Sequence, residues 1–160
     1  MHSLYVWLEN SWWAKLIANS GVASALVEVT HYFSIFLLVG STAIVDLRLL
    51  GVAGQRETAT ELAERLFPTA WAGLGGAVLT GFIMFAGSAR GYYNNGWFNF
   101  KLLVVLVAAI FGLVVQRSVR KWEQLPATPT WGRFVALVSI ALWIAAILVG
   151  VEVPALTGVG

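Results

Sequence analysis

The sequence contains no cysteine and few charged residues. None of its 160 residues is cysteine, which excludes disulfides, thiolate metal ligands and iron–sulfur clusters. Only 11% of the residues are charged, against about 25% in soluble domains, while 59% are hydrophobic and the mean hydropathy is +0.79. Such a chain is expected in a membrane. The chain has too few polar residues to form a separate soluble domain, so a soluble hydrolase or a dinucleotide-binding fold is not expected.

Charge is absent altogether from four long stretches of the chain. No Asp, Glu, Lys or Arg occurs in residues 29–45, 66–89, 102–116 and 134–151. Each stretch is near the roughly 20 residues with which an apolar helix crosses a bilayer. The sequence therefore predicts an all-α, integral membrane four-helix bundle that forms one domain over residues 1–160. We expect its spans at about 21–45, 68–89, 97–116 and 131–153.

The segments between these stretches carry signals of their own. Residues 3–19 place apolar side chains at helical spacing and include three tryptophans, which predicts a helix lying in the membrane interface; an irregular amphipathic leader packed on the bundle is the alternative. The segment QRETATELAERLF at 55–67 predicts a short surface helix, after which Pro68 can begin the second span. The compositions of 91–96 and 125–130 are typical of a turn and a loop.

The distribution of basic residues predicts the orientation. The net charge is +2, and the basic residues stand singly beside the spans, so a nucleic acid is not an expected partner. Four spans put both termini on one side and the first and third loops on the other. These two loops hold seven of the ten basic residues, which predicts that they are cytoplasmic and that both termini are periplasmic in a bacterial inner membrane. The seven are Arg48, Arg56, Arg65, Arg117, Arg120, Lys121 and Arg133, against Lys15, Arg90 and Lys101.

Few ionisable residues fall at membrane depth, where they are costly and mark functional sites. They are Glu28, His31, Asp46, Lys101 and Glu152. At about 100° per residue, the polar residues of the first span fall within an arc of roughly 80°. These are Ser20, Ser24, Glu28, His31, Thr42 and Asp46. Because lipid cannot hydrogen-bond such a face, we expect it to point into protein or a cofactor.

His31 is the only histidine at membrane depth. A neutral imidazole can coordinate a metal through one nitrogen and donate from the other, which predicts His31 as an axial ligand of haem b. The alternative is a histidine hydrogen-bonded to a neighbouring helix. Glu28 forms an E-x-x-H pair with His31, but a di-metal site needs two such pairs. Glu28 is interpreted as a proton carrier, as a partner of His31, or as a neutral carboxyl.

The second span has a face of small residues. Gly73, Ala77 and Gly81 recur every four residues, a spacing that favours close approach of another helix or of a flat macrocycle. One chain offers a single deep histidine, whereas a six-coordinate haem needs two axial ligands. A homodimer about a two-fold axis, in contact through this face, is therefore one way to complete the site.

Three further residues are candidates for cofactor binding. Met84 is one turn beyond Gly81 and can serve as a second axial ligand or as a packing residue. Arg90 and Lys101 are near several aromatic residues at the periplasmic side, where they can bind haem propionates or anchor the chain at the interface.

Several motifs resemble those of a known family. E-V-T-H at 28–31, then Gly40, then D-L-R-L-L-G at 46–51 resemble the hallmark of an uncharacterised bacterial family of four-helix integral membrane proteins. T-G-F-I-M-F at 80–85 and W-F-N-F-K-L-L at 97–103 are also similar to that family, so the resemblance covers most of the chain.

A more distant resemblance concerns haem proteins. The order of histidine, glycine and arginine in one span, with W-x-x-x-K-L-L opening a later one, looks like the four-helix haem-binding protoporphyrinogen oxidases and the copper resistance protein D membrane family. In the oxidases the matching histidine is a haem ligand and the matching lysine is needed for function. The resemblance thus implies these roles for His31 and Lys101.

Together these features favour a b-type haem protein of the inner membrane that acts in electron transfer, with a quinone or a redox protein as partner. If it is an enzyme, it is a membrane oxidoreductase with Glu28 and Lys101 as the expected catalytic residues. A second hypothesis is a transport protein that handles protons or metal ions through Glu28, His31 and Asp46. A third is an accessory subunit of a larger membrane complex.

Overall fold

The protein is all-α, as predicted. A computed structural model describes residues 2–52, 57–92, 95–122 and 130–157. The helices are α1 (His2–Glu9), α2 (Trp12–Ala18), α3 (Gly21–Leu49), α4 (Ala59–Gly87), the short 3-10 helix η1 (Ala89–Tyr92), α5 (Gly96–Trp122) and α6 (Thr130–Thr157).

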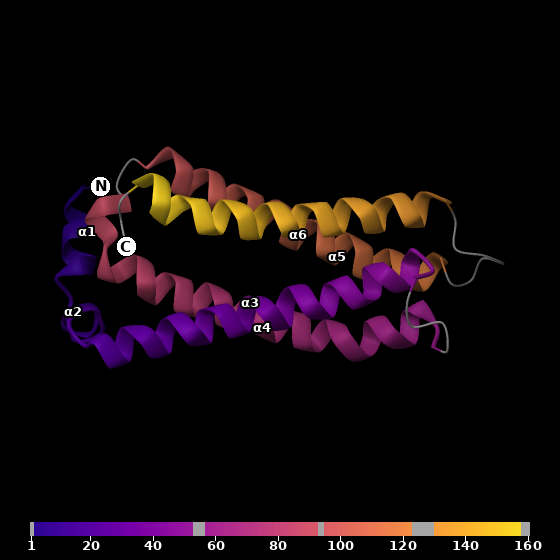
Figure 1. The fold of residues 1–160 in the computed structure, drawn as a ribbon, viewed down its shortest axis with the longest axis horizontal. Coiled ribbons are helices and arrows are strands. Elements are labelled where there is room, and N and C mark those ends of the chain that lie inside the picture. Colours follow the sequence, from indigo (N-terminus) through magenta and orange to yellow (C-terminus); the bar gives the residue numbers. More distant parts are fainter. Residues whose placement is uncertain (1, 53–56, 93–94, 123–129, 158–160) are drawn as a thin grey trace.

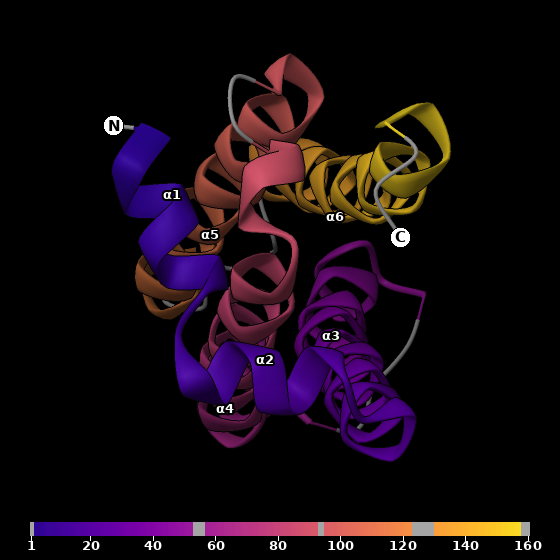
Figure 2. The ribbon, with the colours of Figure 1, turned by 90° about the vertical axis from the view of Figure 1, so that its left-hand side faces the viewer.

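The four long helices form two layers. α3 packs on α4 and α5 packs on α6, and the two antiparallel pairs face each other (Figures 1 and 2). α1 and the last turns of α6 lie at one end of the bundle, which we call the termini end, and α3 runs to α4 and α5 to α6 at the opposite end, the loop end (Figure 1). The described chain therefore begins and ends at the same end of the bundle, as an even number of spans requires.

All four long helices are long and apolar enough to cross a membrane, over Gly21–Leu49, Ala59–Gly87, Gly96–Val119 and Thr130–Gly150. The prediction of four spans is confirmed. The first, third and fourth spans begin within one residue of the predicted positions, but their helices run several residues further. The extra turns carry charged residues such as Arg48 and Arg117, which are solvated where a helix leaves the hydrocarbon.

The prediction of a separate surface helix before Pro68 is wrong. A single helix, α4, runs through both segments with Pro68 inside it. Thr58 and Glu61 form a capping box that starts this helix ten residues before the proline. Pro68 removes a hydrogen bond to the carbonyl of Glu64, but Pro68 and Glu64 are exposed, so the interruption is not buried.

The N-terminal segment contains two helices, α1 and α2. The prediction of a single helix over residues 3–19 is therefore wrong, because the chain is interrupted between them. Asn10 and Ser11 donate side-chain hydrogen bonds to carbonyls of α1, and Ser11 takes an extended conformation before α2. The two helices lie across the termini end (Figure 1). Leu8 and Ala14 pack on Ala86 and Ala89. Exposed on the two helices are Leu4, Trp7, Trp12 and Leu16, which suits contact with the membrane interface.

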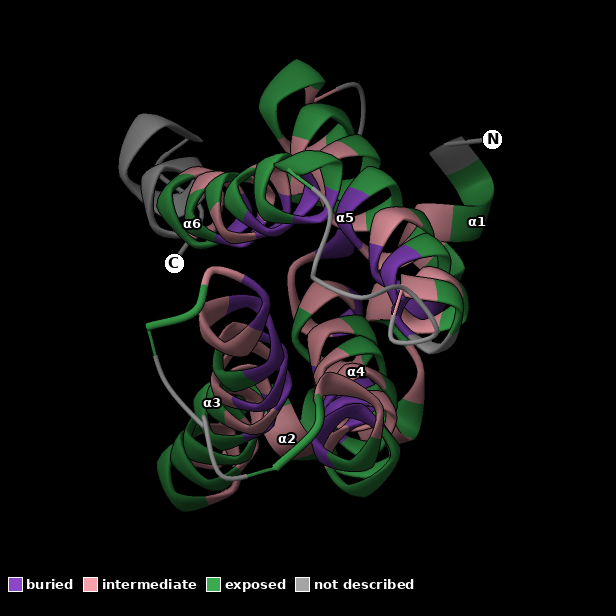
Figure 3. Cartoon of the chain, turned by 90° about the vertical axis from the view of Figure 1, so that its right-hand side faces the viewer, coloured by how far each residue is buried: buried purple, intermediate pink, exposed green. Residues whose placement is uncertain are grey.

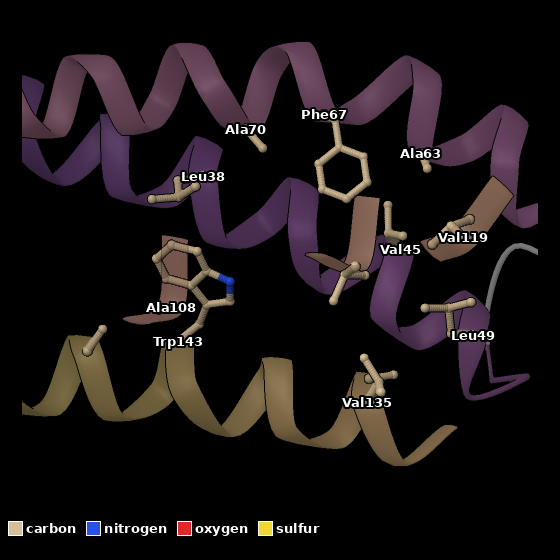
Figure 4. Packing of buried hydrophobic residues seen from close by; sticks show 13 residues of the cluster. Leu38, Val45, Leu49, Ala63, Phe67, Ala70, Ala108, Val119, Val135 and Trp143 are labelled. Atoms are coloured by element: carbon tan, nitrogen blue, oxygen red, sulfur yellow. The ribbon is translucent and has the colours of Figure 1, made fainter. Parts of the chain in front are cut away.

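The main core lies between the layers, where the buried residues of all four long helices face one another (Figure 3). Phe67 of α4, Val45 of α3 and Trp143 of α6 project into this space (Figure 4). Large apolar side chains cover the outside of the bundle, such as Phe33 and Leu106, where lipid would contact them.

The two predicted connections are described only in part. The predicted turn at 91–96 begins as the last residues of η1, and the Asn95 side chain accepts hydrogen bonds from the first turn of α5. Residues 93–94 and 125–129 lie outside the described residues.

Candidate functional site

His31 lies half-buried on α3 and faces α4. Its Nδ1 is 2.9 Å from Oγ1 of the buried Thr80. The Thr80 hydroxyl donates its single proton to the Gly76 carbonyl at 2.6 Å, so toward His31 it can only accept. The hydrogen-bond network thus assigns the ring proton to Nδ1, so that Nε2 carries the lone pair. His31 is also hydrogen-bonded to the backbone of Ala77.

Glycines of α4 bring the two helices close enough for this contact. A Cβ atom on Gly73 would lie 2.7 Å from the Leu38 nitrogen and the Ser34 oxygen, both of them backbone atoms of α3. A Cβ on Gly81 would lie 3.2 Å from Cε1 of His31. The small-residue face therefore packs against α3 of the same chain, as expected for close helix approach. A homodimer needs a different surface.

Lys101 lies in the same half of the bundle as His31, but in the opposite layer, and it adds a positive charge there. It is half-buried on α5, and its Nζ lies 3.8 Å from the position that a Cβ on Gly150 of α6 would take. The Lys101 charge also interacts electrostatically with His31. His31 and Lys101, which the sequence analysis singled out separately, thus belong to one region.

Glu28 is not buried in the region that contains His31 and Lys101. Its side chain is exposed and hydrogen-bonded to Tyr32, one turn further along α3, although its charge, like that of Lys101, interacts electrostatically with His31. The expectation that the whole polar face of the first span points into the protein is therefore wrong at Glu28. The group that holds His31 by a hydrogen bond is Thr80, which the sequence analysis did not propose as a site residue. This is the hydrogen bond to a neighbouring helix that the sequence analysis gave as the alternative to a haem ligand.

The remaining residues of the polar face have separate local roles. Ser20 caps α3, Ser24 donates to the Ile17 carbonyl, and Thr42 donates to the Leu38 carbonyl. Asp46 is buried near the loop end, about 22 Å along the helix from His31 at 1.5 Å per residue. The polar face is not one continuous site. The side chain of Glu152 lies outside the described part of the chain.

Arg90 forms an ion pair that connects η1 to α1. Its Nη2 and Nε donate to Oε1 of Glu9 at 2.7 and 2.9 Å, and its backbone nitrogen donates to Oε2 at 2.8 Å. These hydrogen bonds and the positive charge of Arg90 lower the pKa of the Glu9 carboxyl. A haem propionate would have to compete with Glu9 for this guanidinium.

Other metal ligands are sparse around His31. Met84 is 40% exposed, as a lipid-facing residue of α4 would be. Within the described ranges, no group of three or more His, Cys, Asp or Glu side chains is placed to hold a metal ion. A bare ion needs several protein ligands, whereas a haem iron can be held by one histidine. The predicted metal role of His31 therefore depends on a macrocycle that supplies the other ligands.

The fold and the apolar surface define a multi-pass α-helical membrane protein with a half-buried histidine near its termini end. The chain belongs to a family of unknown function, DUF6644, whose model matches residues 4–154. This agrees with the predicted membership of an uncharacterised family. The comparisons with curated proteins and with solved structures gave no match. The resemblance to the porphyrin oxidases and to copper resistance protein D stays a prediction.

Proposed function

We propose that this protein is a b-type haem protein of the bacterial inner membrane that acts in electron transfer, with His31 as axial ligand. The observation that carries the proposal is the hydrogen bond from His31 to Thr80. Histidines that bind metals almost always donate their other ring N–H to a fixed acceptor, which orients the ring and makes it more basic. Thr80 is such an acceptor, and Nε2 is left to coordinate. Haem would supply one-electron redox chemistry at this site.

The missing side chain of Gly81 leaves room for the ring of His31 itself, which packs directly on α4 there. The surroundings of His31 fit a macrocycle in one respect. Lys101 offers a half-buried ammonium group to a propionate. For the second axial position, the alternatives are a five-coordinate iron, Met84, and a residue of a second copy of the chain. In this proposal Glu28, which is exposed beside Tyr32, would serve as a proton carrier.

The transport hypothesis has less support. Glu28 and Asp46 are about 27 Å apart along α3 at 1.5 Å per residue, and His31 between them bonds to Thr80. These three residues therefore do not form a connected path along the helix. The accessory-subunit hypothesis needs the polar face of α3 to dock another protein, but Thr42 and Asp46 of that face are buried within this chain.

The proposal is tested by the absorbance spectrum of protein purified after expression with ample haem. Wild type is expected to show a haem Soret band. His31→Ala should lose it and still insert, because the four apolar spans drive insertion. His2→Ala, which changes the only other histidine, is the matched control and should keep the band. A colourless wild type, or a full complement of haem in His31→Ala, would refute the axial-ligand assignment. Binding of copper or zinc by a colourless wild type, lost in His31→Ala, would support the metal-handling hypothesis.

A further inference from the structure

Asp46 is the most deeply buried ionisable side chain among those the structure describes. It is 1% exposed and lies between Val45 and Leu49 of α3 in the main core. Its carboxyl is hydrogen-bonded to the hydroxyl of Ser139, which belongs to α6 in the opposite layer. The second oxygen, Oδ2, is buried and has no partner. The carboxyl thus connects the two layers through one hydrogen bond.

Charged groups of the surrounding helices do not neutralise this carboxyl. Arg48, on the same helix, donates from Nε to the Glu57 carbonyl. The charged residues at this end of the neighbouring helices are exposed, namely Glu61, Glu64 and Arg65 on α4, Arg117 and Lys121 on α5, and Arg133 on α6. The side chain of Arg120 lies outside the described residues. The interactions of the Asp46 carboxyl within the described chain include no cation.

A buried carboxylate with one hydrogen-bond donor and no cation is strongly unfavourable, because it loses its hydration without replacement. A protonated carboxyl carries no charge. Its hydroxyl at Oδ1 can donate to Ser139, and the remaining carbonyl oxygen is much less costly to leave unpaired than a charge.

We propose that Asp46 is a proton-binding site that links the two helix layers. In the folded protein the carboxyl is neutral and donates a hydrogen bond to Ser139. Loss of the proton to water at the loop end leaves a charge that the apolar core cannot solvate. Water then enters, and the contact between α3 and α6 loosens. This proposal is independent of haem binding at His31.

Infrared spectroscopy of the purified protein tests the protonation directly. At neutral pH, where exposed carboxyls are ionised, wild type minus Asp46→Asn should show the carbonyl stretch of a protonated carboxyl. Glu61→Gln, which changes an exposed carboxyl at the same end of the bundle, should keep that band. Ser139→Ala should keep the band but shift it to higher frequency, because the hydrogen bond is lost. Absence of an Asp46-dependent band would overturn the proposal, and an unshifted band in Ser139→Ala would overturn the link to α6.

Thermal unfolding in detergent tests the consequence. A group that is neutral in the folded state contributes stability at low pH and loses it as the pH rises. Wild type should therefore lose melting temperature on alkalinisation by more than Asp46→Asn, which stays neutral and can still bond to Ser139. Parallel pH profiles would overturn the proposal. If Asp46→Asn does not fold, the Ser139→Ala band in the infrared spectrum still decides the question.

Discussion

At the scale of single residues, the pairing of His31 with Thr80 depends on where one proton lies. Thr80 has one proton to give, and the Gly76 carbonyl accepts it within the same helix. The threonine oxygen is then an acceptor directed at His31. A helix residue thereby holds a neutral imidazole in one tautomer without a carboxylate partner.

The first prediction concerns this acceptor. Thr80→Val keeps the shape of the side chain and removes the oxygen, so the His31 ring loses its fixed orientation. Haem affinity should fall by about 10- to 100-fold, the usual effect of losing a group that orients a metal ligand. Haem titration of the apoprotein measures this change. Thr69→Val, an exposed position on α4, should have no effect, and Thr80→Ser should retain most of the affinity. Equal affinity in Thr80→Val and wild type would contradict the assigned role.

At the scale of elements, the close approach of α3 to α4 places His31 beside its partner. At Gly73, two backbone atoms of α3 occupy the space that a side chain would need. Backbone atoms cannot move aside without separating the helices, so this glycine determines the distance between them.

The second prediction compares two glycines of α4. Gly73→Ala would place a methyl group 2.7 Å from the backbone of α3 and should destabilise the protein by about 1–3 kcal/mol, the usual cost of overpacking. Gly75→Ala meets nothing within 4 Å and should be neutral or stabilising, because alanine favours the helix by about 0.5–1 kcal/mol. Thermal unfolding in detergent checks both variants. A similar melting temperature for the two would show that the close contact does not limit packing.

The third prediction concerns the contact between α1 and η1. Since hydrogen bonds from Arg90 lower the pKa of Glu9, this contact is stable above the pKa that Glu9 has when unpaired. It should be lost as the pH falls through the lowered pKa, when the carboxyl becomes protonated. Hydrogen exchange in residues 2–9, corrected for the intrinsic effect of pH, should therefore rise on acidification.

The variant Arg90→Gln should show the raised exchange already at neutral pH and respond little to acid. Arg133→Gln, an exposed arginine at the other end of the bundle, is the control and should behave as wild type. Unchanged protection of residues 2–9 in Arg90→Gln at neutral pH would show that other contacts hold α1.

At the scale of the whole molecule, charge and packing are both unevenly distributed along the bundle axis. Exposed basic residues such as Arg65, Arg117 and Arg133 gather at the loop end. The main core also extends to that end, while the termini end carries the crossing helices α1 and α2 (Figure 1). Basic residues favour the cytoplasmic side of a membrane, which predicts that the loop end is cytoplasmic.

The fourth prediction tests this orientation and uses the absence of cysteine. Ser3→Cys and Val52→Cys each introduce one exposed thiol, at the termini end and at the loop end respectively. An impermeant maleimide added to intact spheroplasts should label Ser3→Cys. It should label Val52→Cys only after the membrane is permeabilised. The reverse pattern would contradict the proposed orientation.

Much of the fold could be predicted because the bilayer acts on each segment separately. Uncharged stretches of the right length predict four spans, and an even number of spans brings both termini to one end. The same reasoning singled out His31 and Lys101, because ionisable residues are rare at membrane depth. It failed at Pro68, where a strong capping box upstream outweighed the expectation that a proline begins a helix.

The partners of the site residues depended on tertiary structure. Helical periodicity places Glu28 and His31 on one face, but only the rotation of α3 against α4 leaves Glu28 exposed and turns His31 toward Thr80. Glu9 and Arg90 are 81 residues apart, and Asp46 meets Ser139 from the other layer. Composition and the length of the hydrophobic stretches therefore determined that the chain spans the membrane four times. They also determined which rare polar residues lie at membrane depth. The register between helices, which close contacts at glycine decide, determined what each of those residues binds.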